Sequence, residues 1–458
     1  MKSEREEVIN GILRRSGCIG AEGLAFLKSL TLTQLERLLK CLGKIKAETI
    51  EAKRILIEDD AAPVNPVSGN TEIILPFQIL NLTLQKQFPN EFHIDIDYEP
   101  NMNDLNYWKN YQIVHFHRTI TPDYDKSVSF VEVLNTMGII TIMDLDDYWL
   151  PTMEHPIHPI IVQNKINEKI MANLKVAKYV TTTTSLFANE IKKLNKNVFV
   201  FPNAINPQES QFCEPTIESD KLRIGWLGGS SHLHDIMLLE GLGHHMESHK
   251  NDAQFYICGF DTRGMVTEIN KSTGESTKRP IKPHETVWAR YEEIVTNNYK
   301  LVEPEYKTEL LKWKEFDGKT EWDDHYYQRV WTRPVTSYAK NYSKFDVSLA
   351  PIKNHIFNRM KSQLKVIEAG FYKKALIASN VGPYTIDLKH CLDNGNFVDG
   401  NALLVNENRN HSDWYKFAKK LIQNRNMAKD MGERLYETVK DIYDLNNVTK
   451  TRAEFYKS

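Results

Sequence analysis

The sequence predicts an α/β protein built from two Rossmann-like domains, each with a parallel sheet. From residue 53 onward, short apolar stretches alternate with helical stretches of about 10–15 residues, and the alternation restarts near residue 213. This pattern is typical of parallel sheets with helices on both faces. The length of 458 residues also exceeds what one hydrophobic core usually holds, so more than one domain is expected.

Residues 1–50 are predicted to form a small helical appendage ahead of the sheets. The stretch LTLTQLERLLKCL places apolar residues at helical spacing, and a threonine before the run suits an N-cap. We therefore expect a helical segment here that stands apart from the two sheet domains.

The first sheet domain is predicted over residues 51–212. Its strand candidates are apolar stretches separated by helical or turn-rich segments. In chain order they are RILIE, HIDID, YQIVHFH, GIITIMDLD, KYVTTTT and VFVFPNAINP. Helices are expected through residues 160–175 and at SLFANEIKKLN.

The second sheet domain is predicted over residues 213–408, with an insertion at 262–343 that is rich in charged and aromatic residues. Its strand candidates are LRIGWLG, AQFYICGF, FDVSLAPI, ALIASN and NALLVN. The aromatic side chains of the insertion either stack on sugars or bases or form the core of a helical subdomain. Residues 409–458 are predicted to be helices that pack back on the N-terminal domain.

Composition and charge exclude several classes of protein. The formal net charge of −2 provides no long-range attraction to nucleic acid. No apolar run reaches the roughly 18 residues of a membrane span, and the charged N-terminus lacks the apolar core of a signal peptide. Five scattered cysteines without a CxxC pair indicate neither a zinc site nor a disulfide framework. A reducing, cytoplasmic location is therefore expected.

A charged stripe on one predicted helix is the first candidate binding site. In FNRMKSQLKVIEAGFYK, an apolar stripe that includes Met360 faces the sheet, and Lys361, Lys365 and Glu368 form a second stripe rotated by about 100°. Two ammonium groups near a helix start suit a diphosphate, and a glutamate suits ribose hydroxyls. Exposed ion pairs are the alternative interpretation.

A glycine-rich turn is the second candidate. In GWLGGSSHLHD, Gly228 and Gly229 allow the backbone to approach a phosphate, while Ser230 and Ser231 offer hydroxyl and N–H donors. The pattern is not a full GxGxxG, so a nicotinamide cofactor is not indicated. A tight strand-to-helix turn capped by serine explains the same residues.

Histidines and aspartates follow two strands of the first domain. His115 and His117 share one face of the strand in IVHFHRT, and the carboxyl end of a strand is where substrate contacts are expected. In MDLDDYW, Asp144 and Asp146 form an Asp-x-Asp pair. That pair either binds a metal, caps the next element or lines an acceptor site.

Three segments resemble GT-B-fold glycosyltransferases, above all glycosyltransferase family 4 and related phage-encoded proteins. VFVFPNAINP is similar to that family's domain-junction segment. KSQLKVIEAGFYKKALIASNVGPYTIDL resembles its donor-site helix, strand and loop, and GNALLVN resembles the segment before the C-terminal helices. The likeness covers roughly residues 70–440 and leaves out the appendage and the insertion.

The resemblance implies two domains that face each other across a cleft, with a nucleotide-sugar donor on the second domain. It further implies sugar transfer with retention of configuration and without a metal or other cofactor. Glu368 matches the family glutamate that holds the ribose, and His117 matches a strand-end histidine near the donor sugar. Met360 stands where the family has a glutamate that contacts the donor sugar.

The family's basic pair does not align cleanly with this sequence, so Lys361 and Lys365, with the Gly229–Ser231 amides, are assigned to the diphosphate. The implied mechanism uses no side-chain nucleophile, and the leaving phosphate takes the acceptor proton. The acceptor stays open between a glycan and a modified nucleic acid. Two alternatives remain: a transferase for modified DNA bases, as in some phage members of this fold, and a catalytically inactive nucleotide- or sugar-binding protein.

Overall fold

The structure is a computed structural model, and only part of the chain is described here. The described residues are 53–58, 83–97, 101–121, 123–153, 155, 157–261, 264–269, 276–282, 285–297, 325–394, 396–407 and 410–458. The helical appendage predicted over residues 1–50 lies outside them.

Two six-stranded sheets form the framework, as the alternating pattern predicts. The first sheet has the order β2-β1-β3-β4-β5-β6 and the second β11-β8-β7-β12-β13-β16. The strands of the first are β1 Lys53–Glu58, β2 Phe92–Asp97, β3 Ile113–His117, β4 Ile140–Leu145, β5 Tyr179–Thr182 and β6 Val198–Val200. Those of the second are β7 Leu222–Leu227, β8 Ala253–Phe260, β11 Tyr327–Trp331, β12 Val347–Ala350, β13 Ala375–Ser379 and β16 Leu403–Val405.

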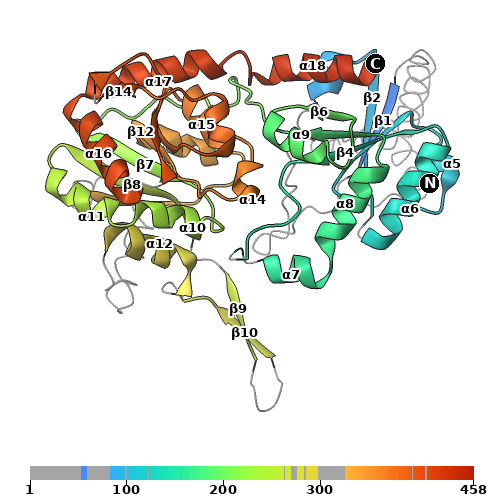
Figure 1. Ribbon diagram of the computed structural model, residues 1–458, viewed down its shortest axis with the longest axis horizontal. Coiled ribbons are helices and arrows are strands. Elements are labelled where there is room, and N and C mark those ends of the chain that lie inside the picture. The colour runs from blue at the N-terminus through green and yellow to red at the C-terminus, as the bar shows by residue number, and fades with distance from the viewer. Residues whose placement is uncertain are drawn as a thin grey trace, which may run out of the picture. The chain divides into compact units, whose positions relative to one another are not determined.

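The helices of the described residues alternate with these strands (Figure 1). The α-helices are α5 Leu105–Trp108, α6 Tyr124–Thr136, α7 His158–Gln163, α8 Ile166–Val176, α9 Ser185–Ile191, α10 Leu233–Ile236, α11 Leu242–Met246, α12 Val287–Thr296, α14 Ile356–Arg359, α15 Leu364–Phe371, α16 Asn410–Gln423, α17 Arg425–Val439 and α18 Leu445–Lys457. Short 3-10 helices are η1 Met237–Leu239, η2 Glu247–His249, η5 Tyr338–Lys344 and η6 Gly382–Ile386. Within the described part of the chain, no helix is both long enough and apolar enough to cross a membrane.

The described chain divides into two compact units. The first comprises the described residues up to Asp144 together with Val176–Tyr179 and Ala453–Ser458, and the second comprises Leu145–Lys175 and Val180–Arg452. The domain boundaries predicted from the sequence remain predictions.

In the first unit, the end of the chain packs on the first sheet. Tyr456 is buried in a cluster with Phe92 and Ile113, and its hydroxyl lies 2.6 Å from Nδ1 of the buried His115. The Lys457 ammonium lies 2.7 Å from a carboxylate oxygen of Glu91. The last turn of α18 is therefore part of the first unit's core.

The second sheet is buried on both faces, and its central strands are mostly apolar, with Arg223 and Ser348 as buried polar residues. Every residue of β7, β12 and β13 is buried. The pairs β7–β8, β7–β12, β12–β13 and β13–β16 are all parallel. Strands covered on both faces read as nearly continuous apolar runs, and this explains why LRIGWL, with one arginine, and ALIAS were recognisable in the sequence.

Part of the stretch predicted to be an insertion belongs to the second sheet itself. β11 is an edge strand that pairs with β8 in parallel, and α12 packs beside it with Trp288 buried in the sheet's core. The Glu292 carboxylate on α12 receives hydrogen bonds from Arg329 and Tyr327 of β11, at 2.9 Å and 2.7 Å. These aromatic and charged residues therefore hold a helix to a strand, and β11 was missed because its alternating polar residues resemble a loop.

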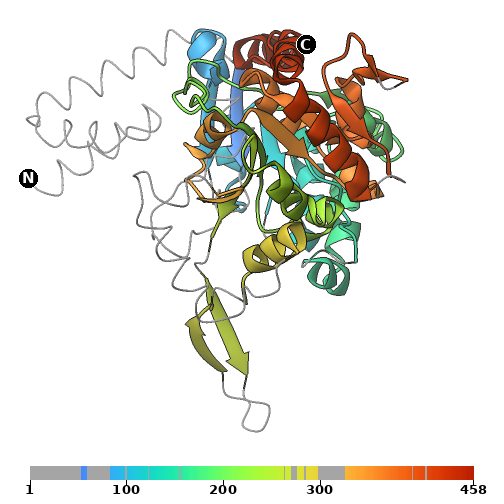
Figure 2. The same cartoon turned by 90° about the vertical axis from the view of Figure 1, so that its left-hand side faces the viewer.

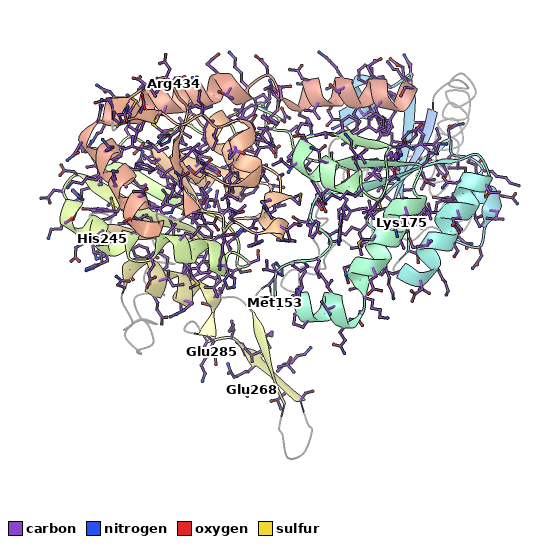
Figure 3. All side chains as sticks on the ribbon, in the orientation of Figure 1. Met153, Lys175, His245, Glu268, Glu285 and Arg434 are labelled. Atoms are coloured by element: carbon purple, nitrogen blue, oxygen red, sulfur yellow. The ribbon has the colours of Figure 1, made fainter. Side chains whose placement is uncertain are left out.

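A two-stranded arm projects from the second unit just before α12 (Figures 1 and 2). It consists of the antiparallel strands β9 Met265–Ile269 and β10 Ser276–Pro280. Arg279 bridges Glu268 and Glu285, with nitrogen–oxygen distances of 2.7 Å and 2.8 Å. Figure 3 labels both glutamates, which lie along the arm and at its base. The arm is stabilised by this ion pair network and by strand pairing, with little apolar burial.

The helix predicted through RMKSQLKVIEAGFYK is two helices in the structure. α14 ends at Arg359 and α15 begins at Leu364, so Lys361 lies in the segment between them. Two side chains of that segment form hydrogen bonds with residues distant in the sequence. Ser362 Oγ accepts from Asn203 at 2.9 Å, and Gln363 donates to the Tyr443 hydroxyl at 2.7 Å. These tertiary hydrogen bonds hold the segment out of a continuous helix.

Tyr443 joins three distant parts of the second unit, and the bond to Gln363 is one of its contacts. Its hydroxyl donates to Asp387 at 2.7 Å, and its carbonyl accepts from the Ile205 amide at 2.8 Å. The start of α15 is therefore tied both to the chain after β6 and to the junction of α17 with α18.

The C-terminal helices do not all pack at one place. α16 contributes Trp414 and Phe417 to the core of the second sheet, and α17 packs against α15 and β13. Only the residues from Ala453 onward belong to the first unit. The packing of residues 409–458 on the N-terminal domain was predicted as a whole, whereas the structure divides these residues between the two units.

Gly432 on α17 provides a test of this packing. A Cβ at this position would lie 2.0 Å from the carbonyl oxygen of Lys373, which is backbone and cannot move aside. Gly432→Ala is therefore expected to lower the free energy of unfolding by about 1–3 kcal/mol, although the same change stabilises an unobstructed helix by about 1 kcal/mol. Urea unfolding followed by tryptophan fluorescence measures the change.

The matched control is Asp430→Ala, at an exposed position of the same helix. It is expected to change the stability by less than about 0.5 kcal/mol. A Gly432→Ala protein as stable as the wild type would show that α17 does not approach Lys373 so closely.

Candidate functional site

A cavity of about 490 Å³ opens at the carboxyl ends of the second sheet's strands. We name it the switch-point cavity, because it is bounded by the segments that follow β7 and β12. Among its lining residues are Leu227, Gly228, Gly229, Asp235, Arg333, Tyr338, Asn341, Ile352, Lys361, Lys365, Glu368 and Tyr384. The strand order of this sheet reverses direction between β7 and β12, and open α/β sheets bind ligands at such a point.

The backbone after β7 approaches the cavity closely because side chains are absent there. A Cβ on Gly228 would lie 2.3 Å from the Trp226 ring, and a Cβ on Gly259 would lie 2.3 Å from the Gly228 carbonyl oxygen. Gly259 also has a φ of +110°, which favours glycine. The Tyr291 hydroxyl fixes the turn by donating to the Gly229 carbonyl at 3.2 Å. The turn therefore presents main chain, not side chains, to the cavity.

Two lysines line the cavity: Lys361 from the segment that leads into α15, and Lys365 from the first turn of α15. Lys365 donates from its ammonium to the Leu227 carbonyl and lies 5.7 Å from the centre of the Trp226 ring. Lys361 lies 5.0 Å above the ring of Phe357. Burial lowers the pKa of Lys365, although the nearby Glu368 carboxylate opposes the effect. A cation held partly out of water gains more from an anionic ligand than an exposed one does.

Glu368 lies deeper in the cavity and is only 2% exposed. Its two oxygens accept hydrogen bonds from the hydroxyls of Tyr338 and Tyr342, the latter at 2.9 Å. Burial raises the pKa of Glu368, while Lys365 and the two hydroxyls act in the opposite direction. The pKa values of both tyrosines are raised well above their ordinary value, first by burial and then by the Glu368 charge. Both tyrosines therefore remain hydrogen-bond donors.

Asp235 is a lining residue for which the sequence predicted no role. Its Oδ2 lies 2.8 Å from His232 Nδ1, and its Oδ1 accepts from the Lys353 amide at 2.8 Å and from the Asn358 side chain at 3.0 Å. Burial acts to raise the pKa of Asp235, but the hydrogen bonds outweigh it and the pKa is lowered. Asp235 thus ties the segment after β12 to the turn after β7. The His-x-x-Asp spacing in SSHLHD was the only signal for it.

The structure separates the two halves of the predicted glycine–serine turn. Gly228 and Gly229 line the switch-point cavity, whereas Ser230 and Ser231 are exposed and line a neighbouring cavity of about 280 Å³. Lys361 lines both cavities. The glycine pair therefore meets Lys365 and Glu368 in one place, and the serine pair does not.

His117 lies in the first unit, whereas the residues that line the switch-point cavity lie in the second. It ends β3, and its Nδ1 lies 3.7 Å from a carboxylate oxygen of Asp144 on β4. Both side chains are largely buried. The role predicted for His117 near a donor sugar stays a prediction. In the second unit, Asp146 and Asp147 are among the residues that line the switch-point cavity.

Several lining residues come from the segment after β11, which the sequence treated as part of an insertion. Arg333 lies two residues after the end of this strand, and Tyr338 and Asn341 lie on η5. Their recruitment depends on β11 being an edge strand of the second sheet. No short motif in the sequence marks these residues as part of a site.

Comparison with known proteins establishes the fold. No model of a protein family matches the sequence, and no curated protein matches it. The chain is similar to the solved structure of sucrose-phosphate synthase (tll1590) from Thermosynechococcus elongatus, with a TM-score of 0.53 and 12% identity over 88% of this chain and 98% of that one.

Two further solved structures carry nucleotide ligands. The trehalose-6-phosphate structure from E. coli bound with UDP-2-fluoro glucose has a TM-score of 0.52 at 10% identity, over 89% of this chain and 99% of that one. Anabaena Alr3699/HepE in complex with UDP and glucose has a TM-score of 0.51 at 9% identity, over 88% and 99%. At these identities the likeness concerns the fold, and it confirms the predicted α/β class with two Rossmann-like, GT-B-type domains.

The arrangement in the switch-point cavity can hold a ligand with both anionic and hydroxyl groups. The lysines suit phosphate oxygens, which only accept hydrogen bonds, and the glycines after β7 allow such a group to approach the backbone closely. The Glu368 carboxylate can only accept, so it suits hydroxyl donors. The cavity therefore offers positive charge at the lysines and, further inside, a hydrogen-bond acceptor at the Glu368 carboxylate.

The burial of Lys365 predicts a pH dependence of stability. Because the pKa of Lys365 is lowered below 10.5 in the folded state, the unfolded chain binds more protons between the two values, and stability due to this group rises with pH in that window. The free energy of unfolding of the wild type should therefore rise relative to that of Lys365→Met as the pH approaches 10.5. Urea unfolding of both proteins at several alkaline pH values measures the difference.

Lys429→Met, at an exposed position on α17, is the control and should show no such trend. The difference in the free energy of unfolding between wild type and Lys365→Met could instead stay constant across the alkaline range. That result would show that Lys365 is fully hydrated in the folded protein.

Proposed function

We propose that the chain is a glycosyltransferase that binds a nucleotide sugar in the switch-point cavity and transfers the sugar to an acceptor. The observation that carries this proposal is that Lys361, Lys365, Glu368 and the glycine pair Gly228–Gly229 all line one cavity at the strand ends. The sequence had placed these residues in two separate motifs.

The solved structures with the same fold support a nucleotide sugar as the ligand. One of them holds UDP and glucose, and another holds UDP-2-fluoro glucose. A diphosphate between two lysines and a ribose near Glu368 fits the order of groups in this cavity. The tyrosine hydroxyls do not saturate Glu368, because a carboxylate offers about four acceptor sites.

In the proposed mechanism, the residues of the cavity act on the leaving group. Negative charge accumulates on the diphosphate as the bond to the sugar breaks, and Lys361 and Lys365 stabilise that charge. The acceptor oxygen bonds to the anomeric carbon from the face that the diphosphate leaves, and the leaving phosphate takes the acceptor proton. No side-chain nucleophile is needed, and attack from this face retains the configuration. We further propose that transfer requires no metal and that His117 lies near the donor sugar, as the resemblance implies.

A nucleotide- or sugar-binding protein without transferase activity is the second candidate. Met360 favours it, because this thioether stands where related transferases have a glutamate that contacts the donor sugar. In the structure Met360 forms the C-cap of α14 and is not among the residues that line the switch-point cavity. The acceptor remains open between a glycan and a modified nucleic acid.

Loss of the Lys365 charge is expected to weaken nucleotide binding. Lys365→Met should reduce the affinity for a nucleoside diphosphate by about 1–3 kcal/mol, the range for one charge-assisted contact. Isothermal titration with UDP, GDP, ADP and CDP measures the affinity, and the exposed Lys429→Met is the control. Equal affinities of wild type and Lys365→Met for the preferred diphosphate would place the diphosphate elsewhere.

Transferase activity is expected to persist without a divalent metal. With its donor and an acceptor, the protein should release nucleotide at the same rate in EDTA as in its absence, since lysines supply the positive charge. A panel of nucleotide sugars with glycan and DNA acceptors measures release, and NMR of the product gives its anomeric configuration. Loss of release in EDTA with recovery in manganese would overturn metal independence, and binding without any release would favour the second candidate.

A further inference from the structure

One side chain in the switch-point cavity has hydrogen-bonding capacity that no described residue of the protein uses. Asn341 on η5 is 0% exposed and lines the cavity, and neither its amide oxygen nor its amide nitrogen has a hydrogen-bond partner within the described part of the chain. Burying an amide in this way opposes folding, and buried polar groups in proteins are otherwise nearly always paired.

The neighbours of Asn341 on the same short helix show the contrast. The polar side chains of these neighbours form hydrogen bonds or ion pairs within the protein. Two hydroxyls bond to Glu368, one ammonium pairs with Glu214, and one hydroxyl bonds to a backbone carbonyl. These neighbours are Tyr338, Lys340, Tyr342 and Ser343. The helix therefore satisfies its polar groups in general, and Asn341 is an exception that faces the cavity.

The chemistry of the amide differs from that of the other polar groups around it. Lys361 and Lys365 can only donate hydrogen bonds, and ionised Glu368 can only accept them. A carboxamide presents a donor and an acceptor side by side, which matches the paired donor and acceptor on the edge of a nucleobase. Phosphate oxygens would use only half of that capacity.

The surroundings of the cavity suit a flat, partly apolar ring near η5. Tyr338, Val335, Pro351 and Ile352 line it together with Asn341. Val335 is 51% exposed, so this wall is reached from solvent. A base inserted here would cover apolar surface with its faces and would reach the amide with its edge.

We propose that Asn341 reads the hydrogen-bonding edge of the donor's nucleobase and thereby determines which nucleotide the cavity accepts. This inference rests on the proposed function, in which the cavity holds a nucleotide sugar. It assigns the base to the η5 side of the cavity and makes Asn341 a specificity-determining residue. A ligand whose base lacks the complementary edge leaves the buried amide unpaired, and such a site rejects it strongly.

The test is isothermal titration of the full chain with UDP, GDP, ADP, CDP and inorganic pyrophosphate. The variant Asn341→Leu keeps the approximate size of the side chain and removes both hydrogen-bonding groups. We expect its affinity for the preferred diphosphate to fall roughly 10- to 100-fold, the range for one bidentate contact to a base. Its affinity for pyrophosphate should stay within about twofold, and the ranking of the four diphosphates should flatten.

Two controls separate recognition from structural damage. Asn426→Leu, at an exposed position on α17, should leave every affinity unchanged. The Tm of ligand-free Asn341→Leu should equal or exceed that of the wild type, because a buried unpaired amide is removed. Independently of any variant, the preferred diphosphate methylated at the ring nitrogen of its pairing edge should bind the wild type at least roughly 10-fold more weakly.

The outcomes distinguish this inference from the proposed function. Suppose that the wild type binds a diphosphate and that Asn341→Leu ranks the four diphosphates by affinity in the same order. This result would overturn only the role of Asn341. An equal loss for all four diphosphates would show that the amide reads the ribose and not the base. If the wild type binds no member of the panel, the proposed function fails and this inference fails with it.

Discussion

Burial of the Glu368 carboxylate is the constraint around which the candidate site is organised. A carboxylate that is 2% exposed is stable only if its charge and lone pairs are compensated. Its partners are the hydroxyls of Tyr338 and Tyr342, which lie on η5, and the Lys365 ammonium one turn earlier on α15. The carboxylate therefore fixes how η5 packs against α15, and that packing forms the inner wall of the switch-point cavity.

Another part of the cavity lining is shaped by glycines, which have no side chain. At Gly228 and Gly259 two stretches of backbone and the Trp226 ring approach so closely that no Cβ fits. One wall thus offers main-chain groups whose positions depend on β7 and β8, and the other offers charged side chains positioned by α15. The strand order brings both walls together at one end of the sheet, where neither could form a binding site alone.

Much of this fold could be predicted from the sequence because the second sheet is buried on both faces, and strands such as LRIGWL and ALIAS therefore read as mostly apolar runs. The same reasoning missed β11, since an edge strand with Gln328 and Arg329 has no such run. It also predicted one helix where Ser362 and Gln363 form long-range hydrogen bonds that interrupt it. Asn341 could not be found from sequence, because its significance lies in having no hydrogen-bond partner among the described residues around it in space.

Tyr443 links three segments of the second unit that are distant in the sequence. One residue joins the chain after β6, the segment around Asp387 and the start of the helix that carries Lys365. The junction of α17 and α18 is therefore joined to Gln363 by one direct side-chain hydrogen bond, from the Gln363 amide to the Tyr443 hydroxyl. A change at Tyr443 consequently affects both the junction of α17 with α18 and the start of the helix that carries Lys365.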